Sequence, residues 1–290
     1  MIAPRTEPPA PNQLLLEALE QRWKKYLSEL KRCRAEFSNE AVHDLRVALR
    51  RLLSLVQLLN SVEPRPRLRK LSRALKTQLD EFDELRDTQV MLAEISETIQ
   101  ELPELETLQD HLERVEKGLL KALRKKIRNL DLKEITRRIW KVRDSLKEEE
   151  KADFAAPILG SVDEAFLVTR QRYERVDPAK PATIHRMRIA FKKLRYMIEI
   201  VHPLLDGFPE ANLKRMNGYQ TLMGEIQDAE VFQQTLADFQ PASSSAPEPV
   251  RRHYELRHAD AISAYLKNKD MLDAFWRASP EEPFPWEKTK

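Results

Sequence analysis

Apolar residues recur every three or four positions along most of the chain, which is the period of an amphipathic α-helix. Most of the 18 prolines fall between the periodic segments, where proline begins or ends a helix. No β-rich stretch competes with this pattern. It predicts an all-α protein, with Asn12 capping the first helix and helices near residues 12–37, 40–62, 66–85, 87–100, 104–130, 133–151, 154–173, 181–202, 209–226, 228–239 and 249–276.

Two parts of the chain repeat each other at a constant offset. The segment VHDLRVALRR at 42–51 aligns with IHRMRIAFKK at 184–193. The same offset, within one residue, aligns RDTQV at 86–90 with QDAEV at 227–231. Two matches in register predict a duplicated helical bundle.

The repeat also predicts how the chain is divided. We expect one domain over residues 12–278, made of two antiparallel helical bundles (about 12–132 and 152–278) that a helix near 133–151 joins. The matching helices should face one another across a pseudo-two-fold axis. Residues 1–11 should be a disordered segment, and residues 279–290, with three prolines, a tail that does not continue a helix.

Each of the two matching helices has a cationic face and an apolar face. At about 100° per residue, one arc of the first helix carries His43, Arg46 and Arg50, joined further along by Ser54 and Gln57. The same arc of the second carries His185, Arg188, Lys192, Arg195 and Tyr196. The opposite sides are apolar, with Leu45, Leu49, Leu52, Val56 and Leu59 on the first helix and Met187, Phe191, Leu194, Ile198 and Val201 on the second.

These stripes contain no carboxylate before Glu199, whereas a solvated helix face usually mixes both charges. They therefore favour a binding site, placed where the two helices meet in a central basic cleft. A phosphate chain suits the residue types, because arginine offers a planar fork, lysine a mobile charge and neutral histidine an N–H donor. The histidine pair predicts stronger binding toward acid pH.

Two further basic stripes leave alternatives open. Arg69, Arg73 and Lys76 share one face, and they either extend the ligand track or pair with Asp80. A stripe that includes Lys121 and Arg124 is equally ambiguous between a ligand track and a solvated face.

Bulk composition is less informative than the distribution of charge. Fifty Lys and Arg against 47 Asp and Glu leave a formal charge of only +3, but residues 65–76 and 180–195 each contain six basic residues and no acid. The single cysteine, Cys33, cannot form an intramolecular disulfide, and no charged-then-apolar leader opens the chain. No apolar run approaches the roughly 20 residues that span a bilayer. We expect a cytoplasmic protein without membrane association.

With these motifs in order, the sequence resembles the CHAD family, the conserved histidine α-helical domain. The resemblance runs from the first helix to about Trp276. It rests on 42–46 with Arg50 and Arg51, on 85–87 with Val90, on 184–185 with Arg188, Lys192, Lys193 and 194–196, and on Gln220, Leu222, Gly224 and Asp228.

The resemblance implies two bundles around a basic cleft that binds inorganic polyphosphate, sometimes on polyphosphate granules, as a module without catalysis, cofactor or metal. Other polyanions and granule-associated proteins are further expected partners. Leu53 stands where the family often has arginine, so the two halves should contribute unequally. The expected polyphosphate-binding residues are His43, Arg46, Arg50, Arg51, Arg69, Arg73, Lys76, Lys121, Arg124, His185, Arg188, Lys192, Lys193, Arg195, Tyr196 and Lys214.

Three other functions compete with this interpretation. A metal-dependent phosphohydrolase would use the pair His43 and Asp44, but the second copy has Arg186 after its histidine. Nucleic-acid binding is less favoured, because most aromatic residues fall at apolar helix positions rather than on a stacking surface. A scaffold that recruits partners is compatible with polyanion binding.

Asp87 and Asp228 occupy matching positions in the repeat. Because aspartate at a junction between helices is usually an N-cap, we interpret both as helix caps rather than as paired catalytic carboxylates.

Overall fold

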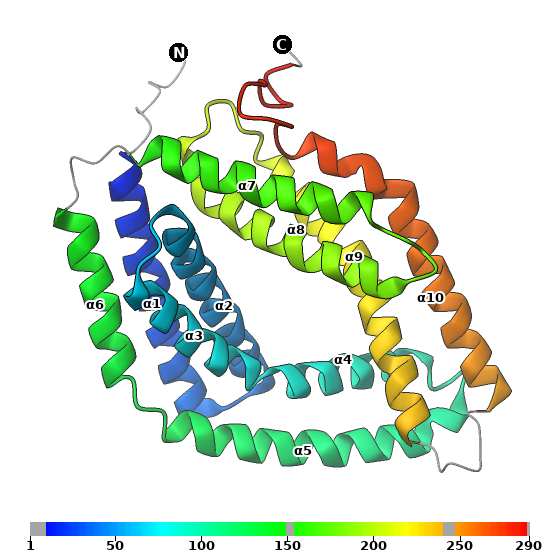
Figure 1. Cartoon of the computed structure of the whole chain (residues 1–290). Coiled ribbons are helices and arrows are strands. Elements are labelled where there is room, and N and C mark those ends of the chain that lie inside the picture. The colour runs from blue at the N-terminus through cyan, green and yellow to red at the C-terminus, as the bar shows by residue number, and fades with distance from the viewer. Residues whose placement is uncertain (1–9, 149–153, 240–246, 289–290) are drawn as a thin grey trace, which may run out of the picture.

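The computed structural model describes residues 10–148, 154–239 and 247–288, and within these ranges it is all-α, as the sequence predicts. Residues 1–9 of the predicted disordered segment and 149–151 of the predicted joining helix lie outside the described residues. The helices, drawn in Figure 1, are α1 (Pro11–Glu36), α2 (Asn39–Val62), α3 (Pro66–Asp80), α4 (Asp83–Thr98), α5 (Glu106–Arg128), α6 (Lys133–Glu148), α7 (Ala155–Glu174), α8 (Pro181–Val201), α9 (Ala211–Phe239) and α10 (Glu248–Asn268), with short 3₁₀ helices at Pro103–Leu105, His202–Leu204 and Lys269–Ala274.

Local sequence explains where several helices begin and end. Proline occupies the first turn of α1, α3 and α8, where its missing N–H costs no helical hydrogen bond. Ser38 caps α2, because its hydroxyl accepts a hydrogen bond from the N–H of Ala41 at 3.1 Å. At the end of α1, Phe37 adopts a left-handed conformation (φ 45°) and donates its N–H to the carbonyl of Cys33.

The structure corrects several sequence predictions about where helices begin and end. The third helix does not reach Leu85, because the chain turns after Asp80 and buries Phe82 before α4 begins. The predicted break before Asp228 is absent, since α9 runs through it. Asp87 thus lies inside α4 and Asp228 inside α9, and neither residue is a helix cap.

Asn12 does not cap the first helix either. It lies within the first turn of α1 and is buried, and Ala10 holds the N-cap position. Pro11 sets the start of this helix instead, because its ring fixes a helical φ angle.

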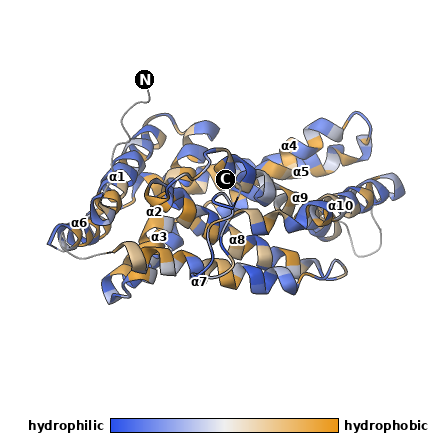
Figure 2. Ribbon diagram, turned by 90° about the horizontal axis from the view of Figure 1, so that it is seen from above, coloured by the Kyte–Doolittle hydropathy of each residue, from blue (hydrophilic) through white to orange (hydrophobic). Residues whose placement is uncertain are grey.

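The pattern of neighbouring helices recurs in the two parts of the chain. α1 packs on α2 as α7 packs on α8, and α4 packs on α5 as α9 packs on α10. Across the parts, α2 contacts α8 and α4 contacts α9. Figure 2 shows α4 and α5 beside α9 and α10 at one end of the molecule, with α1 and α6 at the other. This arrangement agrees with a duplication, and the pseudo-two-fold axis stays a prediction.

The apolar faces predicted for α2 and α8 are confirmed. All ten of the predicted apolar side chains on these helices are buried in the large hydrophobic core, none more than 5% exposed. A separate small core joins α4 and α5 to α9 and α10 around Ile95, Leu105 and Phe232. Each such side chain that is fully buried stabilises the folded state by roughly 1.5–3 kcal/mol. The cationic faces of α2 and α8 are thus carried on well-fixed helices.

The end of the described chain folds back on the second half without continuing a helix, as predicted for 279–290 over its described residues. Asp163 of α7 accepts hydrogen bonds from Trp276 Nε1 at 2.7 Å and from Arg277 at 2.6 and 2.9 Å. The rings of Phe284 and Trp286 stack with centroids 4.6 Å apart. No helix in the described ranges combines the length and the apolar composition needed to cross a bilayer.

Candidate functional site

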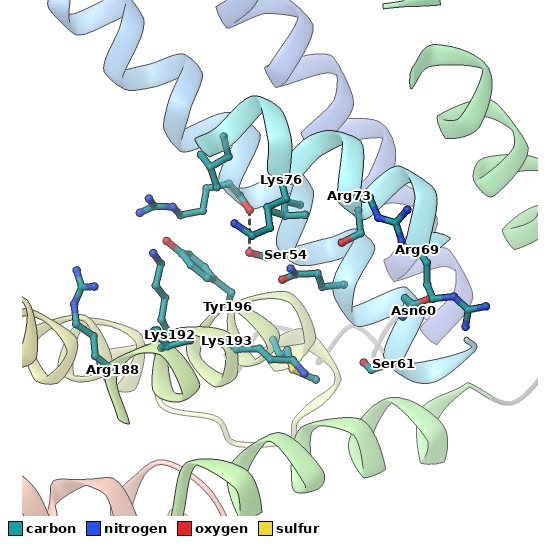
Figure 3. Close-up of a pocket in the computed structure, with 17 residues that line it drawn as sticks. Ser54, Asn60, Ser61, Arg69, Arg73, Lys76, Arg188, Lys192, Lys193 and Tyr196 are labelled. Carbon is teal, nitrogen blue, oxygen red and sulfur yellow. Dashed lines mark hydrogen bonds between the residues drawn. The ribbon is translucent and has the colours of Figure 1, made fainter. Parts of the chain in front are cut away.

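A cavity of about 680 Å³ opens between α2, α3 and α8. Figure 3 shows side chains of α3 and α8 lying on opposite sides of it, with residues of α2 between them. It is lined by Arg50, Leu53, Ser54, Gln57, Asn60 and Ser61 of α2, by Arg69, Ser72, Arg73, Lys76 and Leu79 of α3, and by Arg188, Ile189, Lys192, Lys193, Tyr196 and Met197 of α8.

Helical spacing gathers the cations on the two walls. On α8, Arg188 and Lys192 are four residues apart and therefore stack on one face. On α3, the same spacing joins Arg69 to Arg73, with Lys76 one turn further on. The structure thus brings Arg188, Lys192 and Tyr196 of the second stripe together with the stripe of the third helix in one basic cleft.

The floor of the cleft is one face of α2. It begins at Arg50 and continues with neutral polar groups at Ser54, Gln57 and Asn60. Three polar lining residues, Asn60, Ser61 and Ser72, were not among the residues expected from the sequence. Extending the arc of α2 by one more turn would have found the first two, since they follow Gln57 at spacings of three and four.

No carboxylate is among the residues that line the cleft in the described part of the chain. At its edge, Lys76 Nζ lies 2.7 and 2.8 Å from the two carboxylate oxygens of Asp80. The pairing of Lys76 with Asp80 is thus confirmed, while its part in a ligand track stays a prediction that its place in the lining allows. Within the described ranges, Arg69, Arg73 and Lys192 have no carboxylate within ion-pair distance.

The clustered cations perturb one another. Burial, followed by repulsion from Arg50, Arg188 and Arg46, lowers the pKa of Lys192 to about 7. Burial and then Arg50 also lower the pKa of Arg46, against the opposing effect of Asp83. Burial lowers the pKa of Arg188, with Asp228 opposing it. The charged forms of these side chains are therefore destabilised by burial and mutual repulsion, and a bound anion would stabilise them.

Three guanidinium Nε atoms at the α2 and α8 junction lack protein partners. Those of Arg46, Arg50 and Arg188 are buried and have no hydrogen-bond acceptor among the described residues. These Nε atoms are themselves out of contact with solvent, so a ligand in the cavity would be bound through the terminal N–H groups of the two arginines that line it, Arg50 and Arg188. Phosphate oxygens are suitable acceptors for guanidinium N–H groups.

Two aspartates interact with Arg46 and Arg188. Arg46 Nη2 lies 3.3 Å from Asp83 Oδ1. Desolvation raises the pKa of Asp228, while the positive charge of Arg188 opposes this shift. The repeated aspartate that sequence analysis read as a cap is thus a charge partner of an arginine on the neighbouring helix.

Arg51 and Arg195 belong to a different cluster, which joins the two halves. Glu199 of α8 lies 3.5 Å from Arg51 of α2 and 3.6 Å from Arg195. Arg195 Nε also donates to Oε1 of Gln220 at 2.9 Å, and its guanidinium lies over the ring of Tyr196 at 4.4 Å. These two arginines do not line the cavity.

Other expected residues also lie outside the cavity lining. His43 is exposed, and His185 is partly buried with an unpartnered Nδ1 among the described residues. Arg46 is partly buried and does not line the cavity. On the surface are Lys121, Arg124, whose guanidinium lies 5.6 Å from the Phe37 ring centroid, and Lys214.

The carboxylate proposed for a hydrolase dyad is engaged elsewhere. Asp44 Oδ2 accepts a hydrogen bond from Arg32 Nη1 of α1 at 2.7 Å. In the described part of the chain, no three His, Cys, Asp or Glu side chains form a group able to hold a metal ion. The pairing with Arg32 gives Asp44 a surface role that links α1 to α2.

Comparison with known proteins agrees with this arrangement. The family model of the CHAD domain matches residues 17–237, and curated proteins give no match. Among solved structures, the chain is similar to the CHAD domain of the plant Ricinus communis, with a TM-score of 0.64 and 21% identity, covering 92% of this chain and 90% of that one. That likeness shows a shared fold. Because the family model spans most of its length, the chain belongs to the CHAD domain family.

Proposed function

We propose that the cleft between α2, α3 and α8 binds inorganic polyphosphate and that the chain is a binding module without catalysis. The observation that carries this proposal is the set of seven cations lining one cavity with no acid among the described lining residues: Arg50, Arg69, Arg73, Lys76, Arg188, Lys192 and Lys193. Membership of the CHAD family, which is associated with polyphosphate binding, supports the choice of ligand.

The geometry favours an extended anion over a single phosphate. The two cationic walls are rows along helices, so successive phosphates could contact successive side chains on both. The neutral hydroxyl and amide groups of Ser54, Gln57 and Asn60 can hydrogen-bond to phosphate oxygens without adding charge.

Nucleic acid is the main competing polyanion. The cleft contains one aromatic ring, that of Tyr196, among its described lining residues. That ring already packs under Arg195. Single-stranded nucleic acid is usually bound through several stacked bases, so the lining supports polyphosphate more strongly.

A competition panel tests the ligand. Long polyphosphate, short polyphosphate, single-stranded DNA and RNA would be titrated into the full chain at two salt concentrations. We expect long polyphosphate to bind most tightly at matched charge, with affinity falling as salt rises because counterions are released. Equal affinity for nucleic acid at matched charge would overturn the assignment.

Absence of catalysis needs its own measurement. Phosphate release from polyphosphate would be followed with and without added divalent metal. We expect no turnover, in keeping with the engagement of Asp44 by Arg32. Metal-dependent release would make the chain a hydrolase.

We also propose a cytoplasmic location on polyphosphate granules, with granule-associated proteins as partners. Binding to polyphosphate would be enough to bring the chain there. Fluorescent fusions of the wild type and of a cleft variant would test this: the wild type should coincide with granules, and the variant should stay diffuse.

A further inference from the structure

Lys192 is surrounded by charges of its own sign. Its side chain extends from α8 into the cleft (Figure 3), where Arg188 is one turn away on the same helix. Arg46 and Arg50 face it from α2, and Lys76 of α3 lines the same cavity. Asp83 at the start of α4 opposes these cations.

This setting changes the chemistry of the amine. Burial and the neighbouring arginines lower the pKa of Lys192 to about 7, so about half of these amines are neutral at pH 7. A lysine at the ordinary value of 10.5 is neutral in roughly one molecule in 3,000 at that pH. A neutral amine in contact with solvent is a nucleophile.

The cleft also offers a place for the phosphate of a small reagent beside this amine. Arg50 and Arg188 line the cavity with Lys192, so a phosphate in the cavity can accept hydrogen bonds from both guanidinium groups. Side chains four residues apart on a helix have Cβ atoms about 5–6 Å apart, so a phosphate on Arg188 lies within reach of Lys192. An acyl phosphate carries its reactive carbonyl directly on such a phosphate.

We propose that Lys192 is a site of acylation by acyl phosphates, whose phosphate group docks on Arg50 and Arg188. This inference rests on the phosphate-binding role proposed for the cleft. The lone pair of Nζ attacks the carbonyl carbon, and the bond from that carbon to the phosphate oxygen breaks. Inorganic phosphate leaves with the bonding electrons, the amine gives a proton to water, and an amide remains. Nothing is oxidised or reduced.

Acylation would in turn regulate the cleft. The amide carries no charge at any physiological pH, so one of the two walls loses a cation. Modified protein should therefore bind polyphosphate more weakly than unmodified protein. Bound polyphosphate should protect Lys192, because both ligands need Arg50 and Arg188.

Acetyl phosphate is the probe, and Lys193 is the internal control. The full chain would be incubated with acetyl phosphate at pH 7.5, and initial acetylation rates at each lysine would be measured by mass spectrometry. Lys193 lines the same cavity but is exposed. We expect Lys192 to react at least about tenfold faster, because far more of it is neutral. Inorganic phosphate should slow it, and Lys192→Arg should remove the fast site while leaving helicity unchanged.

Equal rates at Lys192 and Lys193, or a Lys192 rate that inorganic phosphate does not change, would overturn the proposal. Polyphosphate affinity of the unmodified chain would be measured on the same preparation. Normal polyphosphate binding without selective acetylation would refute this inference and leave the proposed function standing. Loss of polyphosphate binding would refute the proposed function on its own.

Discussion

Leu53 of α2 and Arg195 of α8 hold equivalent positions in the two repeats, yet Leu53 lines the cleft and Arg195 is held away from it by Gln220 at 2.9 Å. The cations of the cleft therefore come mainly from α3 and α8 rather than equally from the two stripes. The two halves nevertheless supply four and three lining cations, because α3 of the first half adds Arg69, Arg73 and Lys76. The unequal binding expected from Leu53 therefore stays a prediction, and the sequence did not show that α3 would supply one wall.

Two arginines of α8 should differ sharply in their contribution to binding. Arg188→Gln removes a cation that lines the cleft, and we expect polyphosphate affinity to fall at least about tenfold, since hydrogen bonds to charged groups contribute about 1.5–3 kcal/mol. Arg195→Gln removes the same charge from the cluster with Glu199 and should change affinity less than about threefold. Titration of a labelled polyphosphate would measure both. Equal losses would mean that charge alone, not position, determines binding.

Binding should become weaker as pH rises above neutrality. In the free protein the pKa of Lys192 is about 7, so this amine loses its proton above that pH. A polyanion stabilises the ammonium form and raises its pKa, so the complex keeps the proton. Binding then takes up a proton between about pH 7 and the pKa of the complex, and affinity falls by at most about tenfold per pH unit.

Calorimetry in two buffers of different ionisation enthalpy at pH 8 would count that proton. Lys192→Arg is the matched variant, because arginine stays charged. It should bind without this proton uptake and with a flatter pH profile. Unchanged uptake in the variant would assign the proton to another group.

The sequence predicted the apolar faces of α2 and α8 because helical periodicity determines them locally. It also identified Arg188 and Lys192 as neighbours on one face. It did not predict the turn that separates α3 from α4, which depends on burying Phe82 in a core assembled from distant segments.

The role of Asp228 was missed for a related reason. Its partner, Arg188, lies on another helix, and a single sequence gives no information about contacts between helices. A local rule, the preference of aspartate for helix starts, therefore gave the wrong answer. The positions of Arg51 and Arg195 outside the cleft likewise follow from contacts between helices, of Arg51 with Glu199 of α8 and of Arg195 with Gln220 of α9.

Gly224 of α9 should tolerate alanine but not a large side chain. A Cβ at this position would lie 3.7 Å from Nε and 3.8 Å from Nη2 of Arg188, which is ordinary contact. Gly224→Ala should therefore keep polyphosphate affinity and raise stability by up to about 1 kcal/mol through helix propensity. Gly224→Leu should displace Arg188 and weaken binding. Urea unfolding and polyphosphate titration would be measured on both variants, and weak binding by the alanine variant would contradict this account.

The link between Asp163 and the end of the chain should affect stability rather than binding. Asp163→Ala removes the acceptor for Trp276 and leaves Arg277, whose side chain is 15% exposed, without its carboxylate. We expect a loss of about 2–4 kcal/mol in the free energy of unfolding, with polyphosphate affinity unchanged at a temperature where the variant is folded. A matched Asp163→Asn variant should lose less, because the amide still accepts. A loss below about 0.5 kcal/mol would show that the contact contributes little.

The central claim is that polyphosphate binds between α2, α3 and α8. Its most direct test compares two triple variants of equal charge change, the cleft variant Arg50→Gln, Arg73→Gln and Lys193→Gln and the α5 variant Lys117→Gln, Lys121→Gln and Arg124→Gln. Affinity for long polyphosphate would be measured over a range of salt concentrations, with helicity checked in parallel. We expect the affinity of the cleft variant to fall at least about 100-fold and its salt dependence to become shallower. The affinity of the α5 variant should stay within about threefold of the wild-type value. Equal losses in the two variants, or a larger loss in the α5 variant, would contradict a site in the cleft.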